Sequence, residues 1–178
     1  MRILAVDQSF TSCGLFVLED CDENVINVLH SERFVSDRNL DIFARAWQVT
    51  ERIDVLSKRF NVHHVALEGL AFSQLGNATR DLAGLQFTIV VQLRRENMDV
   101  LIIPPKVVKK LATGKGNAKK EQLYEALPAN IKQLLEANNY KKTTGRYDMS
   151  DAYWIGISAI RELNKISNKN KKNTDDTP

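Results

Sequence analysis

The sequence predicts an α/β domain with one mixed five-stranded sheet and helices on both of its faces. Five short apolar segments are typical of strands, and the first three are close enough in sequence to form hairpins. Each of the last two follows a helical pattern, and a right-handed crossover would place it parallel to the first strand. The 178 residues suit a single domain, which we expect over residues 1–166.

The strands and the first two helices are predicted from changes in the apolar period. The N-terminal meander comprises residues 2–7, 12–18 and 25–35. Two helix–strand pairs follow, at residues 39–60 with 62–68 and 77–97 with 99–103. Pro104-Pro105 ends the last strand, because proline cannot donate to a sheet. Trp47 and Trp154 lie on apolar helical faces, so we expect both in the core.

The C-terminal half is predicted to be mostly helical. Short helices are expected at residues 106–112, 118–127 and 129–138. Asn117 would cap the second of them, and Thr113–Gly116 would form the turn before it. A loop at 139–147 leads to a final helix at 151–163. The segment at 167–178 is polar and of low complexity, so we expect a disordered tail.

Composition excludes several classes of protein. No apolar run approaches the roughly 20 residues that span a membrane. The first residues, MRILAVDQ, are typical of a core strand rather than a signal peptide. Cys13 and Cys21 lack the spacing of a metal site, so we expect reduced thiols in a cytoplasmic protein. His63 and His64 are neighbours in a strand and face opposite sides, which makes them poor joint ligands.

Four acidic residues have the placement of a metal site. Asp7 and Glu68 each end a predicted strand, so parallel pairing would bring both to the carboxyl edge of the sheet. Two buried acids need compensation there, and a divalent cation supplies it. Asp148 and Asp151 share one helical face through their i, i+3 spacing. Taken alone, that pair is better explained by helix capping, whereas the four acids together favour a two-metal site.

A basic stretch lies between Pro104 and Arg146. It holds ten lysines and arginines against three glutamates, a net charge of +7 in a chain whose total is only +3. Such a stretch favours polyanions, although a solvated helical face explains the charge equally well. The candidate DNA contacts in this stretch are Lys106, Lys109, Lys110, Lys115, Lys119 and Arg146.

Four segments, in order, resemble the RuvC-type Holliday junction resolvases. They are ILAVDQSFTSCGLFVL, VALEGLAF, PPKVVKKLATGKGNAKKEQL and YDMSDAYWIGISA, which run from residue 3 to about 160. The resemblance implies a ribonuclease-H-like fold and an endonuclease that nicks four-way DNA junctions. It also implies two Mg²⁺ ions, or Mn²⁺ in their place, bound by Asp7, Glu68, Asp148 and Asp151. Lys110 and Lys120 match basic positions that serve phosphate binding and catalysis in the family.

The resemblance also implies assembly as a homodimer. A four-way junction has two equivalent strands to cut, so a twofold dimer matches its symmetry. The predicted helix at 77–97 is apolar on more than one side, including Val90 and Val91, which suggests a surface for the partner. Hydrolysis at a two-metal site would leave 5′-phosphate and 3′-hydroxyl ends, and we expect four-way and other branched DNA as substrates.

The sequence departs from the family pattern after the second acid. Ala71 occupies a position that is often aromatic in the family, and Phe72 follows it. We hypothesise that Phe72 stacks on a base at the crossover, although anchoring of its loop to the core explains it equally well. The segment NNYKKTTGR before Asp148 is also longer than expected. This looser pattern suggests a phage or other mobile-element version of the family.

Three other functions fit parts of the sequence. DQSFTSCG also resembles the phosphate loop of actin-like sugar kinases and chaperone ATPases, but those proteins need two such domains around a nucleotide. A DNA-binding module without catalysis would have no need of all four acids. A nuclease for RNA–DNA hybrids would have a similar metal site, so the acids alone leave hybrid and junction open as substrates.

Overall fold

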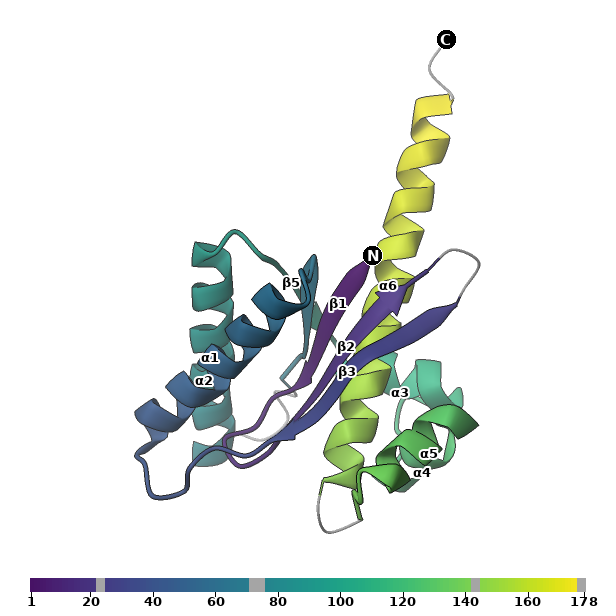
Figure 1. Ribbon diagram of the computed structural model, residues 1–178. Helices are drawn as coiled ribbons and strands as arrows, with labels where there is room; N and C mark the ends of the chain where they lie inside the picture. Colours follow the sequence, from purple (N-terminus) through teal and green to yellow (C-terminus); the bar gives the residue numbers. More distant parts are fainter. Residues whose placement is uncertain (22–24, 71–75, 142–144, 176–178) are drawn as a thin grey trace.

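Five strands form one sheet in the computed structural model, which describes residues 1–21, 25–70, 76–141 and 145–175, with side chains as far as Lys169 (Figure 1). The strands are β1 (Arg2–Asp7), β2 (Cys13–Asp20), β3 (Ile26–Phe34), β4 (His64–Glu68) and β5 (Asp99–Ile103). Their order in the sheet is β3-β2-β1-β4-β5. β2 is antiparallel to β1 and β3, whereas β4 and β5 run parallel to β1. The predicted mixed sheet is confirmed.

Helices cover both faces of this sheet (Figure 1). One face carries α1 (Ile42–Arg59) and α2 (Asn77–Arg95), and the other carries α6 (Arg146–Asp175). Three short helices belong to the α6 layer, namely α3 (Pro105–Thr113), α4 (Lys120–Glu125) and α5 (Ala129–Ala137). β1 contributes side chains to both layers, because successive side chains of a strand point to opposite faces of the sheet. Ile3 and Ala5 pack in the α6 layer, and Leu4 and Val6 in the other.

Close contact between α6 and the sheet depends on a glycine. A Cβ atom at Gly156 would lie 2.5 Å from Leu18 Cδ1 and 3.0 Å from Ala5 Cβ. A larger residue would push the helix away from β1 and β2, and with it the acidic residues near the start of the helix.

The C-terminal part departs most from prediction. α6 begins at Arg146, ahead of the predicted residue 151, and continues to Asp175. The segment from Ser167 is therefore helical as far as Asp175, although its composition predicts disorder. A helix that is already nucleated extends through polar residues at little cost, because each added residue gains a backbone hydrogen bond. In the described part of the chain, no helix is long and apolar enough to cross a membrane.

The two tryptophans have different environments. Trp154 is partly buried against the α6 layer, and its Nε1–H donates to Leu123 O at 3.0 Å. Trp47 is 59% exposed, so its predicted core position is wrong. α1 turns Ile53 and Leu56 toward the sheet, and Trp47 lies outside the face that the sheet covers.

The connection between α3 and α4 is partly as predicted. Gly114, with a φ of 77°, ends α3 in the left-handed region, which confirms the turn at Thr113–Gly116. Asn117 does not cap α4, contrary to prediction. Lys119 is the N-cap residue, and its backbone N–H donates to Gln122 Oε1 at 2.9 Å. The start of α4 is thus stabilised by a side chain of its own first turn.

Candidate active site

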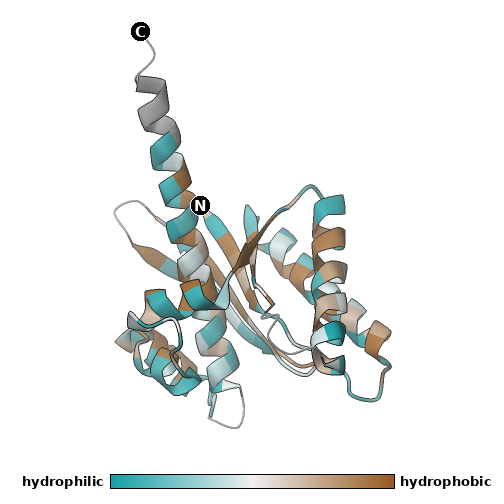
Figure 2. Cartoon of the chain, turned by 180° about the vertical axis from the view of Figure 1, so that it is seen from behind, coloured by the Kyte–Doolittle hydropathy of each residue, from teal (hydrophilic) through white to brown (hydrophobic). Residues whose placement is uncertain are grey.

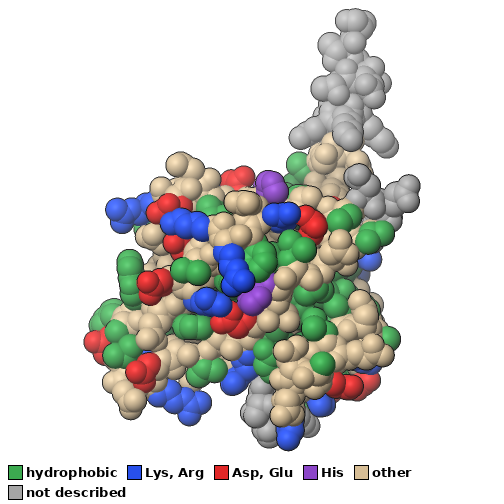
Figure 3. All heavy atoms as spheres, in the orientation of Figure 1, with side chains coloured by type: hydrophobic (Ala, Val, Ile, Leu, Met, Phe, Trp, Pro, Cys, Tyr) green, Lys and Arg blue, Asp and Glu red, His purple; other side chains and the backbone are tan. Residues whose placement is uncertain are grey.

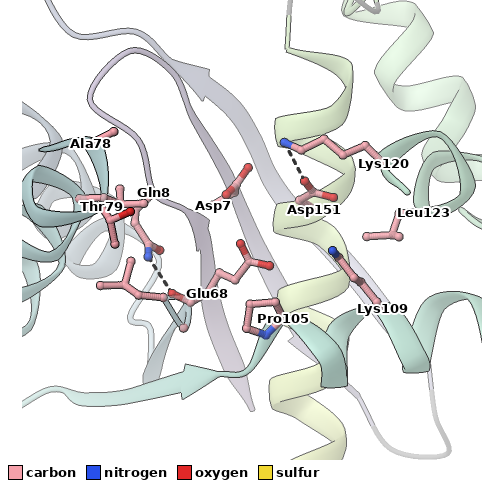
Figure 4. Close-up of a pocket in the computed structure, with 13 residues that line it drawn as sticks. Asp7, Gln8, Glu68, Ala78, Thr79, Pro105, Lys109, Lys120, Leu123 and Asp151 are labelled. Carbon is pink, nitrogen blue, oxygen red and sulfur yellow. Dashed lines mark hydrogen bonds and ion pairs between the residues drawn. The ribbon is translucent and has the colours of Figure 1, made fainter. Parts of the chain in front are cut away.

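Asp7 and Glu68 lie at the carboxyl ends of two neighbouring strands. β1 and β4 are parallel, with Val6 paired to Leu67, so the next residue on each strand is an acid. Both acids line a pocket at this edge of the sheet (Figure 4). The other charged and amide side chains that line it are Gln8, Lys109, Lys120 and Asp151.

The start of α6 brings two more acids to this edge. Asp151 is 8% exposed and lines the pocket, and its Oδ2 lies 3.2 Å from Lys120 Nζ at the start of α4. Asp148 lies about one helical turn earlier. Ser12 Oγ donates to Asp148 Oδ2 at 2.8 Å, and Arg33 Nε lies 4.0 Å from the same oxygen. The carboxylate of Asp148 is therefore held by groups of β3 and the turn before β2 rather than by the pocket.

A second glycine allows the start of α6 to pack closely against β2. A Cβ atom at Gly14 on β2 would overlap the carbonyl oxygen of Asp148, and it would lie 2.6 Å from the carbonyl carbon and 3.1 Å from Ala152 Cβ. Backbone atoms cannot move aside as a flexible side chain can, so glycine alone permits this approach. Gly14 pairs with Asp7 across β1 and β2. The close packing therefore brings Asp148 beside the strand position that carries Asp7.

Two side-chain amides fix the end of β4. Gln8 and Gln86 each donate through Nε2 to the carbonyl oxygen of Glu68, both at 2.7 Å. The N–H of Gly69 donates to Ile103 O at 2.8 Å, so the pairing with β5 continues past Glu68. Neither glutamine was identified from the sequence. Gln8 is adjacent to Asp7, which is a usable signal, whereas Gln86 lies in an amphipathic helix with nothing to distinguish it.

The pocket has the electrostatics of crowded carboxylates. Burial raises the pKa of Asp7 well above its ordinary value, and the charges of Asp151 and Glu68 raise it further. Burial, followed by Asp151, raises the pKa of Glu68 to about 7. Burial raises the pKa of Asp151, against the opposing effect of Lys120. Burial lowers the pKa of Lys120, but Asp151 and Asp7 outweigh this and its net pKa is raised. The pocket therefore favours the uptake of positive charge.

The atoms of the pocket fit a divalent cation. Asp151 Oδ1 and Gln8 Oε1 are buried, and neither makes a hydrogen bond within the described residues. Asp7 and Glu68 add carboxylate oxygens to the same pocket. Carboxylate and amide oxygens are hard ligands of the kind that Mg²⁺ prefers.

These acids are near one another without forming a ready-made coordination shell. Over residues 1–21, 25–70, 76–141 and 145–169, no three His, Cys, Asp or Glu side chains are close enough to hold one ion. Lys120 contacts Asp151, and Ser12 contacts Asp148. Binding of a cation by all four acids would therefore have to replace these contacts.

Comparison with known proteins identifies the family. A sequence model of the crossover junction endodeoxyribonuclease RuvC family matches residues 3–159. The chain belongs to the RuvC family. RuvC of Helicobacter pylori (strain P12) is 26% identical over 163 residues, which cover 92% of this chain and 98% of that relative. As a RuvC-family member the chain is an endodeoxyribonuclease selective for Holliday junctions, as its motifs imply.

Solved structures of RuvC and related resolvases share the fold. Thermus thermophilus RuvC has a TM-score of 0.68 at 21% identity, and the match covers 89% of this chain and 92% of that one. The Fowlpox virus resolvase, solved with its substrate Holliday junction DNA, has a TM-score of 0.60 at 18% identity, with coverage of 92% and 99%. These likenesses confirm the ribonuclease-H-like arrangement that the motifs imply.

The predicted DNA contacts of this RuvC-family chain have different environments. Lys109 lines the pocket, whereas Lys110, the next residue of α3, is exposed outside it. Arg146 lies over the ring of Tyr124, with its Cζ 4.7 Å from the ring centroid, so it takes part in packing at the start of α6. Phe72 and its neighbour Ala71 lie outside the described residues. The remaining predicted contacts are exposed, at Lys106, Lys115 and Lys119.

The raised pKa of Glu68 predicts how pH affects the metal-free protein. Folded Glu68 keeps its proton up to a pKa of about 7, whereas the unfolded chain releases it near 4.5. Between these values the folded state holds the extra proton, so this group's contribution to stability falls as pH rises. We expect the melting temperature in EDTA to fall from pH 5 to pH 7.5, and Glu68→Gln to flatten that fall. A melting temperature that rises over this range in the wild type, but not in Glu68→Gln, would contradict the raised pKa of Glu68.

Proposed function

We propose that this RuvC-family chain is a Mg²⁺-dependent nuclease that binds two ions per site, with Mn²⁺ able to substitute. Asp7, Glu68, Asp148 and Asp151 are the residues that would hold the ions. The supporting observation is that acids from β1, β4 and α6 meet at one edge of the sheet, where burial and mutual repulsion raise the pKa of Asp7. Ions held there would supply an activated water for attack on phosphorus and would stabilise the leaving oxygen. The expected products carry a 5′ phosphate and a 3′ hydroxyl.

Lys120 is the proposed catalytic residue that supplies a positively charged side chain. Its ammonium group lies 3.2 Å from Asp151 Oδ2, and its side chain is 58% exposed on the pocket side of α4. A charge in this position can neutralise negative charge that develops on the phosphate. Lys109 lines the same pocket from α3 and can share this role. The exposed lysines of α3 and of the turn to α4 would hold the backbone of the DNA arms.

A cleavage assay with four substrates tests this function. The protein is incubated with labelled four-way junction, linear duplex, single strand and RNA–DNA hybrid, each with Mg²⁺ and with EDTA. We expect cleavage of the junction in Mg²⁺ alone, with other branched DNA cut less well, and ends that a ligase can seal. Faster cleavage of the hybrid than of the junction would favour the alternative substrate. Junction cleavage that persists in EDTA would exclude the proposed metal dependence.

An exposed apolar surface supports the proposed homodimer. Four large apolar side chains of α1 and α2 are more than half exposed, and Figures 2 and 3 show hydrophobic residues at the outer edge of this layer. They are Phe43 at 82%, Trp47 at 59%, Phe87 at 72% and Val91 at 55% exposure. Trp47, Phe87 and Val91 line a common depression between the two helices. An apolar cluster of this kind on an otherwise polar surface marks a protein interface, and a second copy would match the symmetry of the junction.

A charged substitution in this surface should disrupt the dimer and leave the fold of each protomer intact. Trp47→Glu or Phe87→Glu places a charge in the interface, so we expect a dimer to become a monomer by light scattering at micromolar concentration. Paired nicks within one junction should be lost, whereas the secondary structure should be kept because both side chains are exposed. Ile166→Glu is the matched control, since Ile166 is 50% exposed on α6 away from α1 and α2. A wild-type monomer that makes paired nicks would refute the dimer.

A further inference from the structure

Arg33 is a charged residue beside the proposed metal site that the mechanism does not use. It is the penultimate residue of β3 and pairs with Gly14 of β2, which pairs in turn with Asp7 of β1. Residues paired directly across strands turn their side chains to the same face. Asp7 and Arg33 therefore flank Gly14 on the face that α6 covers. The missing side chain of Gly14 leaves the space that Asp148 occupies.

The side chain of Arg33 is fitted against the start of α6. A Cβ atom at Gly145, whose φ is +93°, would overlap Cδ and Nε of Arg33, so the residue before the helix is a glycine for both space and backbone conformation. The backbone N–H of Arg33 donates to Tyr140 Oη at 3.1 Å, which fixes the strand beside the same segment. The side chain of Arg33 is thus packed against Gly145 and is only 25% exposed, so it is not free on the surface.

The charge of Arg33 is directed at one acid. Its Nε lies 4.0 Å from Asp148 Oδ2, and this nitrogen is buried without a hydrogen bond in the described part of the chain. Ser12 Oγ donates to the same oxygen at 2.8 Å. Ser12 and Arg33 together hold Asp148 outside the pocket that Asp7, Glu68 and Asp151 line.

We infer that Arg33 and Ser12 form a holding site for Asp148, which competes with a divalent cation for this carboxylate. The inference rests on the proposed metal site. Without a cation, the contacts with Ser12 and Arg33 keep the negative charge of Asp148 out of the pocket that Asp7, Glu68 and Asp151 line. Uptake of a cation through Asp148 gives up the contact with Arg33, so Arg33 raises the divalent ion concentration that the site requires. Arg33 is a positioning residue in this scheme, since it acts through Asp148.

Calorimetric titration with Mn²⁺, in the absence of DNA, tests the inference without relying on cleavage. Arg33→Met keeps most of the stem that packs against Gly145 and removes the charge, and we expect it to lower the Kd for Mn²⁺ by about 10-fold. Arg33→Lys keeps the charge and should remain near the wild-type Kd. Ser12→Ala should also tighten binding, by a smaller factor. Arg52→Gln removes an equal charge from an ion pair with Glu32 and should leave the Kd unchanged.

The outcomes separate this inference from the proposed function. Mn²⁺ uptake by the wild type that disappears in Asp7→Asn supports the metal site, and an unchanged or higher Kd in both Arg33→Met and Ser12→Ala would then overturn the holding site alone. Absence of Mn²⁺ uptake by the wild type would overturn both. If Arg33→Met fails to fold, Ser12→Ala decides, because it removes one hydrogen bond to Asp148 and leaves the packing of Arg33 in place.

Discussion

Asp7→Asn is expected to abolish junction cleavage at any practical Mg²⁺ concentration while the protein stays folded. Asn keeps the shape of the side chain and removes one negative charge from the centre of the acidic cluster. Burial and the charges of Asp151 and Glu68 raise the pKa of Asp7, so the metal-free wild type carries unfavourable energy at this position. The melting temperature in EDTA should therefore be unchanged or higher in the variant.

Junction binding distinguishes this expectation from a purely structural role. One fewer negative charge faces the DNA phosphates, so the affinity of Asp7→Asn for the junction in EDTA should be kept or increased. Lys110→Ala should do the opposite, with weaker binding and a smaller salt dependence. If Asp7 only stabilised the turn after β1, stability would fall and activity would follow the fraction of folded protein. A stable, junction-binding variant that nicks at the wild-type rate would remove Asp7 from the mechanism.

Gly14→Ala is expected to cost both stability and activity. The added methyl group meets the backbone of Asp148, 2.6 Å from its carbonyl carbon, and overpacking of this kind costs about 1–3 kcal/mol. The structure can relieve the overlap by moving the start of α6 away from β2, which displaces Asp148 and Asp151. The nicking rate, measured per folded molecule, should fall by more than the loss of stability explains.

Gly84→Ala is the matched control for this variant. Gly84 lies within α2, where an added Cβ meets no atom within 4 Å. Alanine favours the helix over glycine, so urea unfolding should show an increase in stability of about 0.5–1 kcal/mol. The nicking rate should stay at the wild-type value. Equal effects of the two substitutions, in either direction, would mean that the closeness of α6 to β2 has no role in the site.

The strand-end acids were predictable because their signal is local. Asp7 and Glu68 each close an apolar segment, and the parallel pairing of such segments follows from the crossover rule. The placement of Asp148 and Asp151 on one helical face was predictable from their i, i+3 spacing alone. The arrangement of the sheet and the gathering of these acids at its edge therefore follow from neighbouring residues and a few topological rules.

Other features depend on tertiary contacts between residues far apart in the sequence, which local sequence patterns do not predict. Arg33 lies in a strand of mixed polarity, and its approach to Asp148 requires both the strand register and the early start of α6. The exposure of Trp47 was mispredicted because helical periodicity identifies an apolar face of the helix but does not show whether another element packs against that face. The segment from Ser167 was expected to be disordered, since composition does not register the helix that leads into it.

Both ends of the described chain lie at the edge of the sheet opposite to Asp7 and Glu68 (Figure 1). The terminal ammonium of Met1 donates to Asp20 O at 2.9 Å, and Asn164 of α6 donates to Asp20 Oδ2 at 3.1 Å, so α6 passes the N-terminus on its way outward. A fluorophore, an affinity handle or a surface tether added at either end would therefore project away from the edge that carries Asp7 and Glu68. Individual molecules could be immobilised through α6, with the proposed metal site facing solution, and watched as they nick one junction at a time.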